Sequence, residues 1–373
     1  MTGTGGLRFD PSDERLVRAV WSRIAEPTDA VAQRLVAERG AVAALRLVLA
    51  GGGEPRWQVR LPGIDPQADL QLADRYGARL IVPGDDEWPS RIDALGENQP
   101  FCLWARGPLD LQDVSARCVA IVGARAATGY GLGVATRFAQ ECAERGVAVV
   151  SGAAFGIDAA AHQGALSQGG RTLAVLACGV ERAYPRGHER LLDRIATDGC
   201  LISEVPLGTM PARWRFLERN RLIAALAHVV VVVEAGHRSG ALGTAGRAAG
   251  LGVVVAAVPG PITSPASYGA HRLLREGAVC VTSAEEVVEL LEPIGSAPAA
   301  EPPIPRAAYD GLSASDLRVF DALPLRQGAA VTSVGRVAGL EQAAVQAALG
   351  RLELSGLAER DGPGWRKAAK VKR

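Results

Sequence analysis

The chain has 373 residues, of which 48% are hydrophobic and 5% aromatic, and its 41 basic side chains nearly balance 40 acidic ones. This length predicts two or three domains, and the hydrophobic fraction excludes a chain that is disordered over most of its length. No apolar run reaches the ~18 residues of a membrane helix, and no basic-then-apolar leader is present, so we expect a cytoplasmic protein without a membrane contact.

Residues 1–75 are predicted to form a small all-α N-terminal module of the helix-hairpin type. Within it, Arg15–Ile24 places three aliphatic side chains on one face of a helix, and two further helices are expected over residues 31–37 and 43–49. No candidate chemistry is visible in this module.

From about residue 79, short apolar runs alternate with helical stretches. Runs such as Val119–Val122 and Val229–Val233 are apolar at every position, which is typical of strands buried on both faces of a parallel sheet. Residues 76–292 are therefore predicted to be an α/β domain built on a parallel sheet. Ligands of such sheets bind at the carboxyl ends of the strands, where we looked for candidate site residues.

The C-terminal part is predicted to be a separate domain. Residues 293–311 contain five prolines and are expected to form a semi-rigid linker. Residues 312–373 are predicted to hold three helices and a hairpin, the outline of a winged helix-turn-helix domain. Its third helix, within residues 341–353, carries one basic and two acidic residues. Contact with DNA and contact with a protein both stay open for it, and the acidic residues favour the latter.

The first glycine-containing strand end is Val122–Gly131. Gly123 permits a sharp turn, and Thr128 is a candidate N-cap of the next helix, whose N-terminus would attract an anion. Arg125 could add a cation to that site. A dinucleotide-binding fold needs GxGxxG at this turn and an acidic residue after the next strand. The spacing differs here, so NAD binding is disfavoured.

The next strand ends in a second glycine-containing loop. Gly152 and Gly156 permit close approach of a ligand to the backbone, and Ser151 offers a hydroxyl. Asp158 is either a helix cap or a group that orients the loop. His162 is expected to be a packing residue and not a catalyst.

Arg213–Arg221 is the most basic segment, with four arginines and one glutamate in nine residues and with Trp214 and Phe216 between them. Basic side chains follow a phosphate backbone, and exposed aromatic rings stack on bases. The alternative is the start of an amphipathic helix with solvated arginines. The sequence favours the nucleic-acid interpretation because the run directly precedes an apolar helical stretch.

The loop over residues 234–246 brings Ser239, Gly240 and Thr244 to another helix N-terminus. With the loop over residues 177–187, these glycine- or hydroxyl-rich strand ends converge on one edge of one sheet. We therefore predict a site for several phosphates. The net charge is −3 over residues 1–110, +1 over 111–300 and +3 over 301–373, and a local groove needs no large total charge.

No competing chemistry is visible. The five histidines and six cysteines show no HExxH, CxxC or other metal-ligand spacing, and no GxSxG or Walker loop occurs. We therefore assign no catalytic residue, metal or cofactor, and we expect reduced core thiols.

Six motifs, taken in chain order, carry a family resemblance. They are Val119-Ala-Ile-Val-Gly-Ala-Arg125, Val150-Ser-Gly with Gly156-Ile-Asp-Ala-Ala-Ala-His162, Ala174-Val-Leu-Ala-Cys-Gly-Val with Tyr184-Pro185, Arg219-Asn-Arg221, Val232-Val-Glu-Ala and Ser239-Gly-Ala-Leu. Over residues 83–291 the sequence resembles the DNA-processing protein A (DprA/Smf) family.

The resemblance implies an extended Rossmann-like domain, a homodimer, and a cytosolic, non-enzymatic protein that binds single-stranded DNA. Proteins of this family protect incoming DNA during natural transformation and load the RecA recombinase onto it. By position, it implies DNA contacts from Arg125, Ser151, Gly152, Gly156, Arg213, Phe216, Arg219, Asn220, Arg221, Ser239 and Gly240. It implies a dimer interface that includes Tyr268, His271, Leu273 and Leu274.

Five positions depart from the family pattern. Phe155 stands where a basic residue is usual, Leu217 where a proline is frequent, His188 and His271 where asparagines are usual, and Leu251 where an arginine follows glycine. These departures predict a less basic pocket.

Two alternative functions stay open from the sequence. One is a phosphoribohydrolase-like enzyme, although the glutamate expected after Arg238–Thr244 is missing. The other is a winged-helix regulator, which the acidic candidate recognition helix disfavours.

Overall fold

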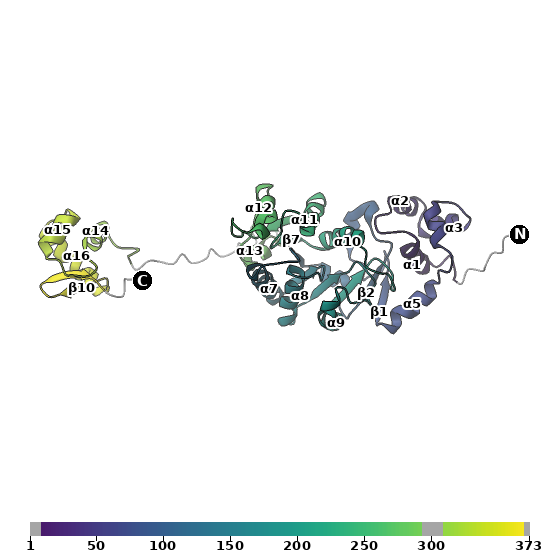
Figure 1. Cartoon of the computed structure of the whole chain (residues 1–373), viewed down its shortest axis with the longest axis horizontal. Helices are drawn as coiled ribbons and strands as arrows, with labels where there is room; N and C mark the ends of the chain where they lie inside the picture. The colour runs from purple at the N-terminus through teal and green to yellow at the C-terminus, as the bar shows by residue number, and fades with distance from the viewer. Residues whose placement is uncertain (1–8, 293–308, 369–373) are drawn as a thin grey trace. The chain divides into compact units, whose positions relative to one another are not determined.

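The computed structural model describes residues 9–292 and 309–368. The chain divides into two compact units, residues 1–299 and residues 300–373 (Figure 1). The division falls inside the predicted linker, most of which lies outside the described residues. The helices assigned to the N-terminal module and the predicted α/β domain share the first unit. The predicted domain limits themselves stay predictions.

Five short helices open the first unit and lie beside β1 and β2 (Figure 1). They are α1 (Glu14–Ile24), α2 (Ala30–Arg39), α3 (Ala41–Leu49), α4 (Pro55–Arg60) and α5 (Pro66–Arg75). Aspartates begin three of them, because the side chains of Asp13, Asp29 and Asp65 accept hydrogen bonds from the free N–H groups of the first turn. Their core is aromatic: the Trp21 ring lies 5.5 Å from the rings of both Trp57 and Phe101.

A nine-stranded sheet organises the rest of this unit, in the order β1-β2-β6-β5-β4-β3-β7-β8-β9. The strands are β1 (Ala78–Ile81), β2 (Leu103–Arg106), β3 (Cys118–Val122), β4 (Ala148–Ser151), β5 (Thr172–Val175), β6 (Cys200–Ser203), β7 (Val229–Val232), β8 (Val254–Ala257) and β9 (Val279–Cys280). All neighbouring pairs from β6 to β9 are parallel, as predicted, whereas β2 pairs antiparallel with β1 and β6. The sequence analysis did not identify β2, whose apolar run is only five residues long between Pro100 and Arg106.

Helices cover both faces of the sheet. The helices that follow β1 are α6 (Leu111–Ser115), α7 (Gly129–Glu144), α8 (Ile157–Ser167), α9 (Glu189–Asp198), α10 (Arg213–Leu226), α11 (Gly240–Gly250), α12 (Tyr268–Arg275) and α13 (Ala284–Glu289). On one face α7, α8 and α13 pack on Val119 and Ile121. On the other face α10, α11 and α12 pack on Ala120 and Val122. Alternate residues of one strand thus enter two cores, so the run is apolar throughout.

The second unit contains three helices and a hairpin in the predicted order. They are α14 (Ala314–Ala322), α15 (Val331–Ala338), α16 (Gln342–Leu354), β10 (Ala358–Asp361) and β11 (Gly364–Lys367). Phe320, Leu349 and Trp365 belong to its core, and the Arg351 guanidinium lies 2.6 Å from the Asp316 carboxylate. The interpretation of this unit as a winged helix-turn-helix stays a prediction.

Five of the six cysteines are buried, and Cys280 is exposed on the edge strand β9. Burial raises the pKa of Cys102, Cys118 and Cys200 to about 12, so these thiols stay protonated and unreactive. The prediction of core thiols was wrong for Cys280. Over residues 9–292 and 309–368, no helix is long and apolar enough to cross a membrane.

Candidate functional site

The predicted DNA-binding residues lie on α10 and on the loops that follow β4, β3 and β7, strands that are adjacent in the sheet. Because these strands are parallel, their carboxyl ends share one edge, and each loop runs from that edge toward the helix that follows. Gly156 lets the loop after β4 approach the backbone of the loop after β3 closely. Its φ is +80°, and a Cβ there would lie 2.2 Å from the Ala124 carbonyl oxygen, so only glycine fits.

The N-terminus of α7 already holds an anion from the protein itself. The buried Glu234 carboxylate accepts hydrogen bonds from the Thr128 N–H at 2.8 Å and from the Thr128 hydroxyl at 2.6 Å. Thr128 also caps the helix as predicted, by accepting from the Gly131 N–H. The expectation of an open phosphate site at this N-terminus was therefore wrong. Glu234 lies within a family motif, but no spacing in the sequence marked it as a partner of Thr128.

The loop after β4 is also held by an internal acid. The Asp158 carboxylate accepts hydrogen bonds from the N–H groups of Gly152 and Ala154, at 3.2 and 3.4 Å. Asp158 therefore orients this loop, and burial raises its pKa against the opposing effect of Arg219. The Ser151 hydroxyl is buried and donates to the Ile121 carbonyl oxygen at 2.7 Å. Its predicted contact with a ligand is contradicted.

His162 is buried on α8, where its Nδ1 lies 2.8 Å from the Thr172 hydroxyl. Burial lowers the pKa of His162 to about 3, with Arg219 and His188 adding to the effect. The ring is therefore neutral at physiological pH, which supports the packing role.

Arg219 projects from α10 into the space that Gly152 leaves open. A Cβ on Gly152 would lie 2.0 Å from the Arg219 guanidinium, and Nη1 of Arg219 donates to the Val175 carbonyl oxygen at 2.5 Å. Burial lowers the pKa of Arg219 to about 10, so the side chain stays cationic at neutral pH. Among the described residues its buried Nε has no hydrogen-bond partner.

Phe216 stands at the centre of the site. Its ring centroid lies 5.5 Å from the Arg125 guanidinium carbon, 6.0 Å from that of Arg219 and 5.3 Å from the Tyr184 ring. The α10 helix and the loops after β3 and β5 thus bring two cations and two aromatic rings together. The sequence analysis did not assign Tyr184, although the motif Tyr184-Pro185 was a signal that could have found it.

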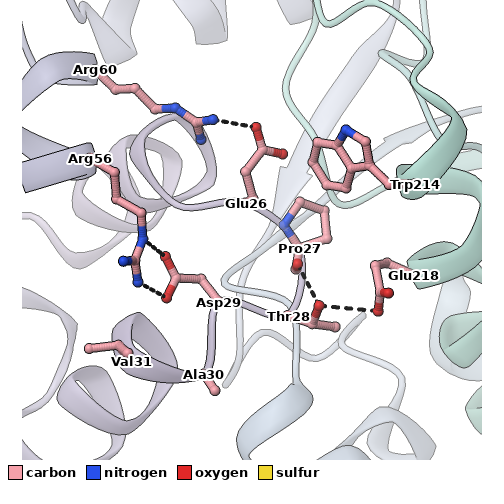
Figure 2. Close-up of a pocket in the computed structure, with 10 residues that line it drawn as sticks. All are labelled: Glu26, Pro27, Thr28, Asp29, Ala30, Val31, Arg56, Arg60, Trp214 and Glu218. Atoms are coloured by element: carbon pink, nitrogen blue, oxygen red, sulfur yellow. Dashed lines mark hydrogen bonds and ion pairs between the residues drawn. The ribbon is translucent and has the colours of Figure 1, made fainter. Parts of the chain in front are cut away.

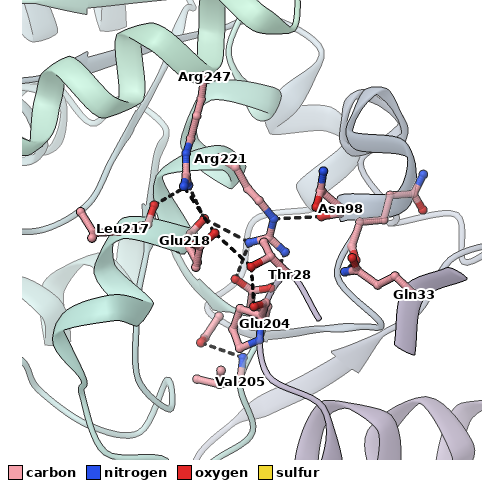
Figure 3. Close-up of polar contacts among 12 residues, drawn as sticks. Thr28, Gln33, Asn98, Glu204, Val205, Leu217, Glu218, Arg221 and Arg247 are labelled. Carbon is pink, nitrogen blue, oxygen red and sulfur yellow. Dashed lines mark hydrogen bonds and ion pairs between the residues drawn. The ribbon is translucent and has the colours of Figure 1, made fainter. Parts of the chain in front are cut away.

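Two of the other three arginines of the basic run, Arg215 and Arg221, are paired with acids and add no net charge to this cluster. The Arg221 guanidinium is buried and pairs with the Glu204 carboxylate at 2.6 and 2.7 Å, and its Nε donates to the Asn98 carbonyl oxygen (Figure 3). The predicted phosphate contact of Arg221 is contradicted because this pair occupies the side chain. Arg215 pairs with Glu26 at 3.1 Å. Arg213 is exposed and has no ion pair within the described residues.

Trp214 lines a different surface, a pocket of about 540 Å³ between α10 and the N-terminal helices (Figure 2). The charged groups of this pocket are largely paired with one another: Arg56 with Asp29 at 2.8 Å, and Arg60 with Glu26 at 2.6 Å. The pocket therefore offers little free positive charge to a phosphate backbone.

The loop after β7 is the last of the loops at the carboxyl edge of the sheet that carry predicted site residues. Ser239 is the N-cap of α11, and its hydroxyl accepts from the Ala241 N–H at 3.3 Å. Asn220 donates to the Gly240 carbonyl oxygen at 3.3 Å and so joins α10 to α11. These contacts orient the loop and leave Gly240 exposed.

Residues 79–292, more than half of the chain, match the family model described as DNA recombination-mediator protein A. The chain belongs to this family. A candidate DNA processing protein DprA of Mycobacterium tuberculosis is 49% identical, over 93% of each chain. A solved structure of DprA from Streptococcus pneumoniae covers 77% of this chain and 99% of its own, with 31% identity and a TM-score of 0.63. The DprA structure from Helicobacter pylori, whose description concerns single-stranded DNA binding, covers 58% and 96%, with 28% identity and a TM-score of 0.53.

The residues expected at a DprA dimer interface differ in how far they are exposed to a second chain. Tyr268 is exposed, and the His271 imidazole lies 2.9 Å from the Gly260 carbonyl oxygen. Both line a pocket of about 480 Å³. Leu273 is buried in the core under α12, and Leu274 packs partly against the same core. The prediction of Leu273 as an interface residue is contradicted because its side chain is used within the chain.

Proposed function

We propose that this chain binds single-stranded DNA at the carboxyl edge of its sheet and acts as a recombination mediator. Membership of the DprA family supports the proposal, as does the binding of single-stranded DNA by the Helicobacter pylori relative. The observation that carries it is the position of Phe216 between Arg125 and Arg219, with Tyr184 against the same ring.

This arrangement suits a flexible single strand. An arginine guanidinium binds phosphate oxygens through two donors, and an aromatic ring stacks on a base of any sequence. In a duplex the bases are already stacked on one another, so Phe216 and Tyr184 would have nothing to stack on. Binding is therefore expected to favour single strands, with low sequence specificity.

Within this function, the backbone of Gly156, Ser239 and Gly240 borders the strand, and Arg213 and Asn220 lie at the start and along one side of α10. The predicted DNA contact of Gly152 is contradicted, because Gly152 is buried and its N–H donates to Asp158. We include in the proposal a non-enzymatic role in the cytoplasm, protection of incoming DNA in natural transformation, homodimerisation, and loading of the RecA recombinase. Light scattering of the full chain tests the dimer, and a pull-down with the RecA of the same host tests the loading role.

A fluorescence-anisotropy titration tests the DNA preference. The full chain is titrated into labelled oligo-dT and into a duplex of equal length at the same salt concentration. We expect binding to oligo-dT to be at least tenfold tighter. Equal or tighter binding to the duplex would contradict the proposal and favour a duplex-binding role for the second unit.

A further inference from the structure

Exposed aromatic side chains gather at the carboxyl edge of the sheet. Phe155 on the loop after β4 and Tyr184 on the loop after β5 are 48% and 39% exposed. An exposed phenyl ring usually has no function by itself, because single apolar side chains are common on protein surfaces. Phe155, however, lies against the ring of His188, which follows Tyr184 of the site around Phe216 on the same loop.

The Phe155 ring is held against His188. The two ring centroids are 4.4 Å apart with an interplanar angle of 66°, an edge-to-face contact. The His188 Nδ1 lies 3.0 Å from the Ala153 carbonyl oxygen, so the imidazole joins the loop after β5 to the loop after β4. A Cβ on Gly187 would lie 3.4 Å from the Phe155 ring, which shows that the backbone also borders it. The ring is therefore supported on one side, while almost half of its surface faces solvent.

This pair continues the site around Phe216. Tyr184, which contacts Phe216, and His188, which contacts Phe155, lie four residues apart on one loop. Arg186 lies between them in the sequence, is exposed, and has no ion pair within the described residues. Aromatic rings and unpaired cations therefore follow each other from Arg125 and Phe216 to Phe155.

We infer that Phe155, supported by His188, is a second base-stacking position for single-stranded DNA, with Arg186 contacting the phosphate backbone beside it. The inference rests on the proposed function and adds a position to the same site. A stacked base contributes affinity without releasing counterions, so this position adds a component of binding that salt does not weaken.

The first test compares the full-length wild type with F155A on two probes, oligo-dT and an oligomer of equal length made of abasic nucleotides. On oligo-dT we expect F155A to bind roughly 5- to 150-fold more weakly, the range for loss of one base stack. On the abasic probe the two proteins should bind equally, because no base is present to stack. Thermal unfolding followed by circular dichroism checks that F155A keeps its fold.

The second test uses salt dependence. We expect F155A to leave the slope of log K against log salt unchanged, and R186A to make it shallower by about 0.7, the value for one phosphate contact of a single strand. F155R should steepen the slope by about the same amount and reduce the discrimination between the two probes, with the remainder due to Phe216 and Tyr184. Y76A is the matched control, because Tyr76 is 46% exposed and precedes β1 at the opposite edge of the sheet.

The outcomes separate the inference from the proposed function. If the wild type binds oligo-dT while F155A and Y76A bind it as tightly as the wild type, the stacking position is wrong and the proposed function stands. If the wild type binds neither probe, the proposed function itself fails. An equal loss for F155A on both probes would also overturn the inference, because the effect would then not depend on a base.

Discussion

At the scale of single residues, the arginines of the basic run have different roles. Successive positions on an α-helix turn by about 100°, so the side chains of a short run point in several directions. Arg219 enters the site, Arg221 pairs with Glu204, and Arg215 pairs with Glu26. The charge of the run was predictable from the sequence. The direction of each side chain was not, because the acids that pair with them, Glu26 and Glu204, lie outside the run.

An exposed arginine of the site and a buried, paired arginine should respond differently to substitution: the first should affect DNA binding, and the second should affect stability. R125A should weaken binding to oligo-dT roughly tenfold, because a charge-assisted contact contributes about 1.5 kcal/mol. Its free energy of unfolding should stay within about 0.5 kcal/mol of the wild type, since Arg125 is exposed. Anisotropy and urea denaturation measure the two quantities.

R221A should instead lower the free energy of unfolding by about 3–5 kcal/mol, because it leaves the buried Glu204 carboxylate without its partner. An R221A variant as stable as the wild type would show that the buried pair has little structural role. An R125A variant with unchanged DNA binding would remove Arg125 from the site.

At the scale of elements, the apolar strands and most helices were predictable because their residue patterns are local. The antiparallel β2 and the partner of Glu234 were not, because Glu234 accepts from the Thr128 N–H of a loop that is far from it in the sequence. The loop-orienting role of Asp158 was one of the two roles expected from the sequence, because the N–H groups that it accepts from lie in its own loop. The loops at the carboxyl edge are thus fixed before any ligand arrives, which orients Arg125 and Arg219 in advance.

The contact between α8 and β5 predicts a pH dependence of stability. His162 must stay neutral in the folded chain, where its pKa is about 3, whereas in the unfolded chain it takes up a proton near pH 6.5. The unfolded state therefore binds more protons between these values, and stability falls as the pH falls. Between pH 6.5 and 5 we expect a loss of about 2 kcal/mol.

Urea denaturation of the wild type and of H162Q at pH 7 and pH 5 measures this effect. Glutamine keeps a polar group near the Thr172 hydroxyl but does not titrate, so H162Q should lose about 2 kcal/mol less than the wild type over this range. The same loss in both proteins would assign the acid sensitivity to other groups.

At the scale of the whole molecule, the net charge of +1 does not describe the binding surface. About half of the arginines in the described part of the first unit form ion pairs with acids, and the site combines the exposed Arg125 and the buried Arg219 with aromatic rings. Such a surface is expected to bind single strands through stacking as much as through charge. In the second unit Arg360 and Lys367 also lie over aromatic rings, those of Trp365 and Phe320, at 4.8 and 4.2 Å, but both rings belong to the core of that unit.

Photochemical cross-linking tests the location of the DNA most directly. The full chain is irradiated with an oligo-dT that carries 5-iododeoxyuridine, which reacts with nearby aromatic side chains, and the modified peptides are identified by mass spectrometry. We expect adducts on the peptides that carry Tyr184 and Phe216. Adducts confined to residues 341–354 of the second unit, with none on these peptides, would contradict the assignment of the DNA site to the carboxyl edge of the sheet.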